Sequence, residues 1–179
     1  NIHLHYSNGQ TYWDAGHDGS SYDRINTSNP SGVLGQWNHW AYTKNASTGR
    51  MEVYLNGSLF MGGNGKTKPI GSLSGGSLRV GGDTSFFYDG ELNNLKIFNS
   101  SLTQDQVREL YTKPETVLPT GVSASNLKLD LPMQEKAGSI IYDGSGNQNH
   151  GTITGATFVT GEEYGYQASL VRSNTPIIF

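Results

Sequence analysis

The sequence contains no cysteine and little charge, and each shortage narrows the functions it can carry. Without cysteine among its 179 residues, the chain has no disulfide, no zinc–thiolate site and no thiol nucleophile. Charged residues make up 15% of the chain, against about 25% in an average soluble domain, and the net charge is −3. No basic run or stripe appears, so the sequence lacks the electrostatic footprint of a nucleic-acid partner.

Long apolar runs are missing as well. No stretch approaches the roughly 18 consecutive apolar residues that indicate a membrane-spanning helix, so we expect no membrane span. The chain starts at Asn1 and not at a methionine, as a processed product or a fragment would. The absence of cysteine leaves the compartment open, because surface proteins also do without it.

The chain is rich in glycine, with 24 residues, and in tyrosine, with 10, where an average domain would have more charged residues. Glycine and asparagine supply the positive φ angles of tight turns, and tyrosine and tryptophan favour strands. Alternation of apolar and polar side chains predicts strands, and residues 36–44 form an expected strand with large groups on both faces. Expected strands with their approximate bounds are 2–6, 11–13, 36–44, 51–55, 58–61, 77–80, 92–98, 127–131, 151–153, 156–159, 167–171 and 177–179. Short strands and glycine-rich turns predict an antiparallel sandwich or jelly roll.

Two local motifs are specific enough to predict single elements. Asn56-Gly57 lies between two strand patterns within 51–61, which predicts a hairpin with a type I′ turn. Residues 103–106 (Thr-Gln-Asp-Gln) have the form of a capping box, and the apolar positions of 107–111 continue a short helical stripe. Proline and glycine in residues 113–123 indicate a linker after this helix.

Five segments resemble parts of laminin-G-like domains. Residues 35–43 (GQWNHWAYT) resemble their G-x-W-x-H-x-A strand, and 51–57 (MEVYLNG) their Y-x-N/D-G hairpin. Residues 90–99 are similar to the closing strand, and 102–111 to the short helix that ends the domain. Residues 143–151 (DGSGNQNHG) resemble the D-x-S-G-N-x-N-x-G motif near the beginning. The resemblance implies an all-β, antiparallel two-sheet jelly-roll sandwich of the laminin-G-like, concanavalin-A-like lectin/glucanase kind, with one short helix.

The order of these segments departs from the family. The closing two-thirds of the domain come first, in residues 1–112, and the opening third comes last, in 124–179, after the linker 113–123. The last part therefore belongs either to the same domain, permuted, or to the next copy. The first part alone would leave strand edges unpaired and apolar faces bare, and the second is too short to bury a sizeable core. We expect residues 124–179 to add strands to a neighbouring copy by β-augmentation, which gives head-to-tail assembly.

Catalysis is not expected. The concanavalin-like glucanases that the chain resembles carry paired acids on one strand, and a retaining glycosidase needs two carboxyl groups about 5–5.5 Å apart. The comparable stretch, residues 91–95 (Glu-Leu-Asn-Asn-Leu), has Glu91 as its single carboxylate. Amides cannot exchange protons near neutral pH, so the sequence predicts that the protein is not an enzyme.

Calcium is the expected cofactor. Laminin-G-like domains often hold a calcium ion at a sheet rim, and Ca²⁺ binds carboxylate, amide and backbone oxygens from a folded loop. Asp143, Asn147 and Asn149 could present such oxygens from one glycine-rich loop. The alternative is a loop of Asx-turns, in which the same side chains bond their own backbone.

Aromatic and acidic residues crowd into the stretch 12–24. Sugar recognition combines aromatic faces with carboxylates and amides that bind hydroxyl groups. The alternative is a structured loop whose aromatic side chains pack on their own sheet. The expected carbohydrate-binding residues are Tyr12, Trp13, Asp14, His17, Asp18, Tyr22, Asp23 and Arg24.

The sequence therefore predicts a non-catalytic extracellular or surface-exposed module for carbohydrate binding or adhesion. The alternative is a structural subunit of a fibre, capsid or surface assembly built by head-to-tail strand exchange. The expected partners are glycans or neighbouring copies of the chain, with no nucleic acid and no membrane span.

Overall fold

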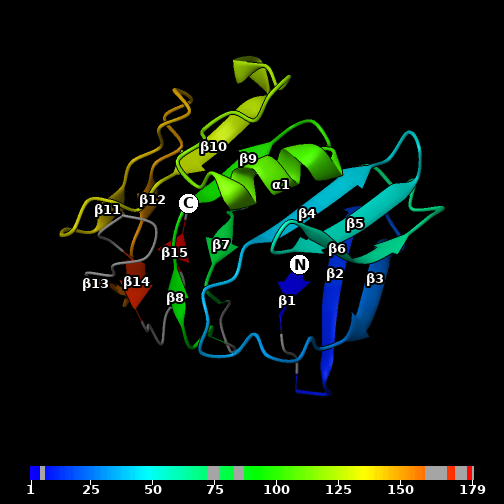
Figure 1. Cartoon of the computed structure of the whole chain (residues 1–179), viewed down its shortest axis with the longest axis horizontal. Helices are drawn as coiled ribbons and strands as arrows, with labels where there is room; N and C mark the ends of the chain where they lie inside the picture. Colours follow the sequence, from blue (N-terminus) through cyan, green and yellow to red (C-terminus); the bar gives the residue numbers. More distant parts are fainter. Residues whose placement is uncertain (5–6, 72–76, 83–86, 160–168, 172–176, 179) are drawn as a thin grey trace. The chain divides into compact units, whose positions relative to one another are not determined.

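The structure, a computed structural model, confirms a mostly β, antiparallel fold (Figure 1). It describes residues 1–4, 7–71, 77–82, 87–159, 169–171 and 177–178. Two compact units share the chain: unit 1 comprises Asn1–Ser72 and Ser100–Gly121, and unit 2 comprises Leu73–Asn99 and Val122–Phe179. The chain thus passes from one unit to the other within residues 1–112. The family order assigned to residues 1–112 and 124–179 stays a prediction.

The first sheet of unit 1 has the order β1-β2-β3, with β1 (Ile2–His3), β2 (Gln10–His17) and β3 (Tyr22–Ser28). Residues 5–6 of the expected first strand lie outside the described residues. Residues 14–22, which are rich in aspartate and glycine, are expected to form a loop; this prediction is wrong, because β2 and β3 form an antiparallel hairpin with a register shift between Ala15 and His17. The turn occupies only residues 18–21, and the shift interrupts the period-2 pattern that would have indicated the strand.

The second sheet of unit 1 has the order β4-β5-β6, with β4 (Trp40–Asn45), β5 (Arg50–Leu55) and β6 (Ser58–Gly63). The predicted hairpin is confirmed. Asn56 and Gly57 join β5 to β6 with φ angles of 50° and 74°, the conformation that a type I′ turn requires.

The tryptophan strand begins at Trp40 and not at Gln36 as the sequence suggested. Before Trp40, side-chain amides bind the backbone in place of a strand ladder. The Asn38 amide donates to the carbonyls of Val33 and Gln36, and the His39 N–H donates to Asn56 Oδ1 at 2.8 Å. These bonds hold the chain in a curved approach to the sheet.

The core of unit 1 lies between its two sheets. Trp13 and Ile25 come from the first sheet, and Met51, Val53 and Met61 come from the second. All five are buried, and each such side chain contributes about 1.5–3 kcal/mol. Because both sheets supply one apolar face to a shared core, unit 1 is a two-layer sandwich.

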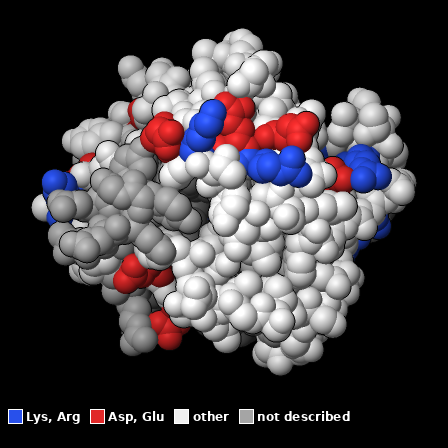
Figure 2. Space-filling model, viewed as in Figure 1, with Lys and Arg blue, Asp and Glu red and all other residues white. Residues whose placement is uncertain are grey.

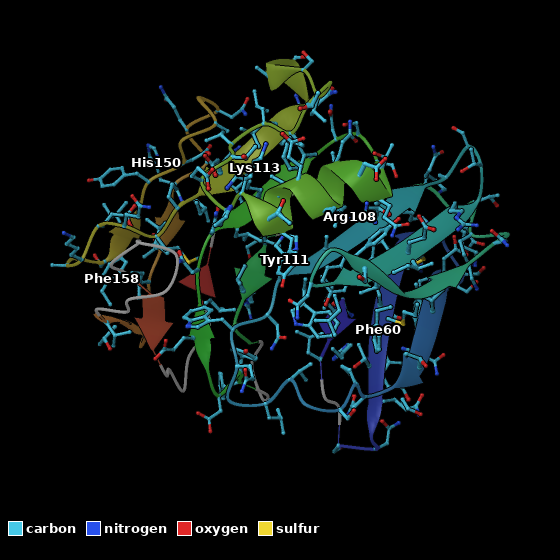
Figure 3. The ribbon with its side chains drawn as sticks, in the orientation of Figure 1. Phe60, Arg108, Tyr111, Lys113, His150 and Phe158 are labelled. Atoms are coloured by element: carbon cyan, nitrogen blue, oxygen red, sulfur yellow. The ribbon has the colours of Figure 1, made fainter. Side chains whose placement is uncertain are left out.

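Helix α1 (Gln104–Thr112) follows the predicted capping box. The Thr103 hydroxyl accepts from the Gln106 N–H, and the Gln106 side chain accepts from the Thr103 N–H. Val107 is fully buried, and Tyr111 lies against the β5–β6 turn, where a Cβ on Gly57 would be 3.1 Å from Tyr111 Cδ1. Figure 3 shows Arg108 and Tyr111 on α1, on the side of β6. On the face seen in Figure 2, charged side chains gather in a band over this helix.

The expected linker is fastened to α1 near its end. The Thr120 N–H donates to Glu109 Oε2 at 2.8 Å, and Gln106 Nε2 donates to the Thr120 carbonyl at 3.1 Å. Pro119 is fully buried. The linker therefore follows the helix for part of its length.

Unit 2 is built from short strands. Its sheets have the orders β10-β9, β11-β12-β15-β7 and β13-β14-β8. Its described core comprises buried Leu129, Leu131, Met133, Ile141 and Ile153. The elements are β7 (Arg79–Val80), β8 (Glu91–Leu92), β9 (Leu95–Phe98), the 3₁₀ turn η1 (Ala124–Asn126), β10 (Leu127–Leu131), β11 (Ile140–Ile141), β12 (Gly151–Thr152), β13 (Thr157–Val159), β14 (Ser169–Val171) and β15 (Ile177–Ile178).

Strand β10 pairs with β9 of its own chain, with Leu131 opposite Leu95 and Asp130 opposite Lys96. Lys96 Nζ and Asp130 Oδ1 lie 3.3 Å apart, and both side chains are largely buried. Within this single chain β10 thus has its partner strand, and the exchange of residues 124–179 with a neighbouring copy stays a prediction. A tethered segment meets its partner at an effective concentration that a free copy does not reach.

Candidate functional site

The outer face of the β2–β3 hairpin gathers polar and aromatic side chains. Strand side chains alternate between faces, and Trp13 and Ile25 enter the core, so their neighbours along each strand point away from it. Asp14 lies opposite Arg24, and Tyr12 lies opposite Asn26. We call this face the β2–β3 platform; it consists of Gln10, Tyr12, Asp14, Tyr22, Arg24 and Asn26.

Arg24 is fixed on the platform by a two-pronged ion pair. Its Nε donates to Asp14 Oδ1 at 2.6 Å and its Nη2 to Asp14 Oδ2 at 2.7 Å. The hydrogen bonds that Arg24 donates to the Asp14 carboxylate raise the pKa of Arg24 above its usual value. The Asp14 side chain is buried, whereas the Arg24 side chain is 41% exposed. This planar fork holds the guanidinium in one orientation.

The Arg24 guanidinium also holds two tyrosines. Its central carbon lies 4.8 Å from the Tyr12 ring centroid and 5.1 Å from that of Tyr22, within the range of cation–π contacts. Nη2 donates a third hydrogen bond to the Tyr22 hydroxyl at 3.0 Å. Tyr22 remains 49% exposed. The platform thus presents an aromatic ring to solvent in an orientation that Arg24 restrains.

Side-chain amides extend the platform. Asn26 Nδ2 donates to Gln10 Oε1 at 3.1 Å, in an exposed position. Asn8 Nδ2 donates to the Tyr12 hydroxyl at 2.5 Å. The sequence interpretation missed Gln10 and Asn26. The alternation of residues 10–14 and 22–28 was the signal that places them on the same face as Tyr12 and Arg24.

Two predicted site residues, Trp13 and Asp23, lie on the inner face. Trp13 belongs to the core, with its ring 5.5 Å from that of Tyr42. Asp23 Oδ2 accepts from buried Lys44 Nζ at 2.6 Å and from the Lys68 N–H at 2.9 Å. Burial acts to raise the pKa of Asp23, but these hydrogen bonds bring it below its usual value. Both side chains thus lie on the inner face of the hairpin and not on the platform.

Asp18 and His17 shape the turn between the two strands. Asp18 Oδ1 accepts from the N–H groups of Ser21 at 2.9 Å and Ser20 at 3.0 Å, and Lys68 Nζ lies 3.1 Å from Oδ2. These hydrogen bonds, that from Ser21 first, hold the pKa of Asp18 well below its usual value. His17 Nδ1 accepts from the Gly19 N–H at 2.9 Å. Of the eight predicted residues, the structure brings together Tyr12, Asp14, Tyr22 and Arg24 on the platform.

The second predicted site is the Asp143 loop, residues 143–149 of unit 2. Asp143 is buried, and its Oδ1 accepts from the N–H groups of Asp130 and Ser145, both at 2.9 Å. Its Oδ2 accepts from Ser145 Oγ at 2.8 Å and from the Asn149 N–H at 3.0 Å. Burial acts to raise the pKa of Asp143, but these bonds, that from Asp130 first, lower it overall.

Asn147 and Asn149 fasten the same loop to β10. Asn147 Nδ2 donates to the Leu127 carbonyl at 3.0 Å, and Asn149 Nδ2 donates to the Lys128 carbonyl at 3.1 Å. The arrangement matches the Asx-turn alternative, in which the side chains bond the backbone. Among the described residues, no group of three or more His, Cys, Asp or Glu side chains gathers as metal ligands would. Calcium at this loop stays a prediction.

Two antiparallel sheets that share one core, with a short helix beside the second, define a sandwich of the laminin-G-like class. A laminin G family model, described as the concanavalin A-like lectin/glucanases superfamily, matches residues 1–108, and the chain belongs to this family. A search of curated proteins and a search of solved structures each found no match.

Domains of this family are generally non-catalytic binding modules and are typically extracellular, although the superfamily includes glucanases. The family thus supports a module of the carbohydrate-binding or adhesion type. Within the part of the chain that the structure describes, no helix is long and apolar enough to cross a membrane.

Proposed function

We propose that the chain is a non-catalytic, extracellular or surface-exposed carbohydrate-binding module whose ligand rests on the β2–β3 platform. The observation that carries the proposal is the restraint of exposed Tyr22 by Arg24, which is itself fixed by Asp14. If the glycan is attached to another cell or molecule, its binding by this module would hold the two surfaces together, which is adhesion.

The platform has the groups that a sugar requires. The exposed ring of Tyr22 offers a face to the C–H groups of a pyranose. Arg24, Asn26 and Gln10 supply hydrogen-bond donors and acceptors for its hydroxyl groups. Ordering a free side chain on binding costs about 0.5–1.5 kcal/mol, so a ring that is already held retains more of its contact energy.

Catalysis is not supported by the carboxylates of this hairpin. A retaining glycosidase needs one protonated carboxyl group beside a second, ionised one. The Asp14 carboxylate accepts two hydrogen bonds from Arg24, and the pKa values of Asp18 and Asp23 are both lowered, so at neutral pH neither of the latter holds a proton to donate. We therefore assign these groups to structure and binding.

A glycan array tests the proposal. Wild-type protein should bind a defined set of glycans, and Tyr22→Ala should weaken that binding at least tenfold because the stacking face is lost. Tyr142→Ala is the matched control, since Tyr142 is a 57% exposed tyrosine outside the platform. Equal loss in both variants, or wild-type binding that Tyr22→Ala leaves unchanged, would place the site elsewhere.

A further inference from the structure

We infer that the platform selects uncharged glycans over sulfated, sialylated or uronate-containing ones. The inference rests on the proposed function and names the chemical class of its ligand. It follows from the pairing of the charged side chains of the β2–β3 hairpin, since each of them has an oppositely charged side chain as its partner.

The cation of the platform is Arg24, and the Asp14 carboxylate neutralises its charge in an ion pair. Two parallel hydrogen bonds of 2.6 and 2.7 Å join the two groups. A guanidinium that recognises a sulfate or carboxylate uses this same fork. An anionic ligand would therefore have to displace the buried Asp14 carboxylate or approach alongside it, and like charges repel.

The remaining charges of the β1-β2-β3 sheet are also paired. Within residues 1–28 the charged side chains are Asp14, Asp18, Asp23 and Arg24. Asp18 pairs with Lys68 at 3.1 Å, and Asp23 pairs with buried Lys44 at 2.6 Å. The three carboxylates and their three side-chain cations balance, so the side chains of the hairpin supply no surplus positive charge to attract an anion.

The sequence around the platform supports the same conclusion. Residues 1–13 and 25–43 contain no Lys, Arg, Asp or Glu. The platform groups outside the Asp14–Arg24 pair are the Tyr12 and Tyr22 hydroxyls and the amides of Gln10 and Asn26. Hydroxyls and amides both donate and accept, which matches the hydroxyl groups of a neutral sugar.

Titration calorimetry with neutral, sulfated and sialylated oligosaccharides, each at 50 and 500 mM NaCl, tests the inference. Neutral glycans should bind, and their Kd should change less than about twofold between the two salt concentrations, because no net charge is neutralised. Binding confined to anionic glycans, with a Kd that rises more than about tenfold in high salt, would overturn the assigned class and leave carbohydrate binding standing. Binding to no glycan of any class would overturn the proposed function as well.

The substitution Asp14→Asn gives a second readout. It leaves the volume of the side chain almost unchanged and removes the negative charge from beneath Arg24. We expect the variant to acquire salt-sensitive binding of a sulfated oligosaccharide that the wild type binds at least about tenfold more weakly. A wild type that already binds this oligosaccharide as tightly as the variant would refute the pairing argument. Circular dichroism of both proteins checks that the variant is folded.

Discussion

Replacing Asp143 with alanine removes the acceptor that organises the Asp143 loop. Its carboxylate accepts four hydrogen bonds, from the N–H groups of Asp130, Ser145 and Asn149 and from the Ser145 hydroxyl. Alanine offers no acceptor, and the side chain lies in a buried position that water reaches poorly. The donors, above all the buried Asp130 N–H, then lose their partner.

The size of the loss follows from these bonds. A hydrogen bond to a charged group contributes about 1.5–3 kcal/mol, but members of one network do not add. Each buried donor left without an acceptor costs about 1–3 kcal/mol, and several donors lose theirs here, so the total comes to about 3–5 kcal/mol. We expect the free energy of unfolding to fall by about that amount. At about 3 °C per kcal/mol for a chain of this size, the melting temperature should fall by about 10–15 °C.

Thermal melting in EDTA and in added Ca²⁺ checks this prediction. Asp105→Ala is the control, because Asp105 is 90% exposed and should contribute less than about 1 kcal/mol. If the carboxylate serves only as the acceptor for these protein donors, the difference between wild type and Asp143→Ala should be the same in both buffers. A Ca²⁺-dependent stabilisation that the variant lacks would refute this reasoning and assign the loop to calcium.

Two further predictions concern unit 1 and the oligomeric state. Lys44→Met removes the buried partner of Asp23 and should lower the free energy of unfolding by about 3–5 kcal/mol in urea titrations, whereas a loss below about 1 kcal/mol would show that the pair is dispensable. Because β10 pairs with β9 of its own chain, light scattering at micromolar concentration should give a monomer of 19.4 kDa, and a filament or ring would contradict the in-chain pairing.

The parts of the fold that the sequence predicts correctly are local. The Asn56-Gly57 turn and the Thr103 capping box each depend on residues within a few positions of one another. The β2–β3 hairpin was missed because aspartate and glycine in residues 14–20 are typical of loops. The register shift between Ala15 and His17 also breaks the alternation.

The composition of the sequence indicates which stretch forms the candidate site, but it does not indicate which face of the sheet each side chain occupies. The sequence indicates the right stretch, yet it cannot tell which side chains enter the core without the register of the strands. Trp13 and Tyr12 are adjacent, and only the packing of Trp13 with Ile25 decides that Tyr12 points outward. The matching of Arg24 to Asp14 likewise depends on a cross-strand pairing between residues ten positions apart.

Strand exchange between copies was predicted for a related reason. The reversed order of the family segments is visible in the sequence, but the partner of residues 127–131 is not. Two partner strands are possible for residues 127–131: β9 of the same chain and β9 of another copy. The sequence is the same in both cases and cannot distinguish them; within one chain, the structure pairs β10 with β9 and places Lys96 beside Asp130.

Nuclear magnetic resonance shows most directly whether a glycan binds on the β2–β3 platform. A ¹⁵N-labelled sample is titrated with a glycan that the array selects, and the Arg24 Nε–H signal is followed with the backbone amides. We expect the largest shifts on Arg24 Nε–H, which donates to Asp14 at 2.6 Å, and on the amides of Tyr12, Tyr22 and Asn26. Shifts concentrated on the Asp143 loop or on α1, with the platform signals unmoved, would contradict it.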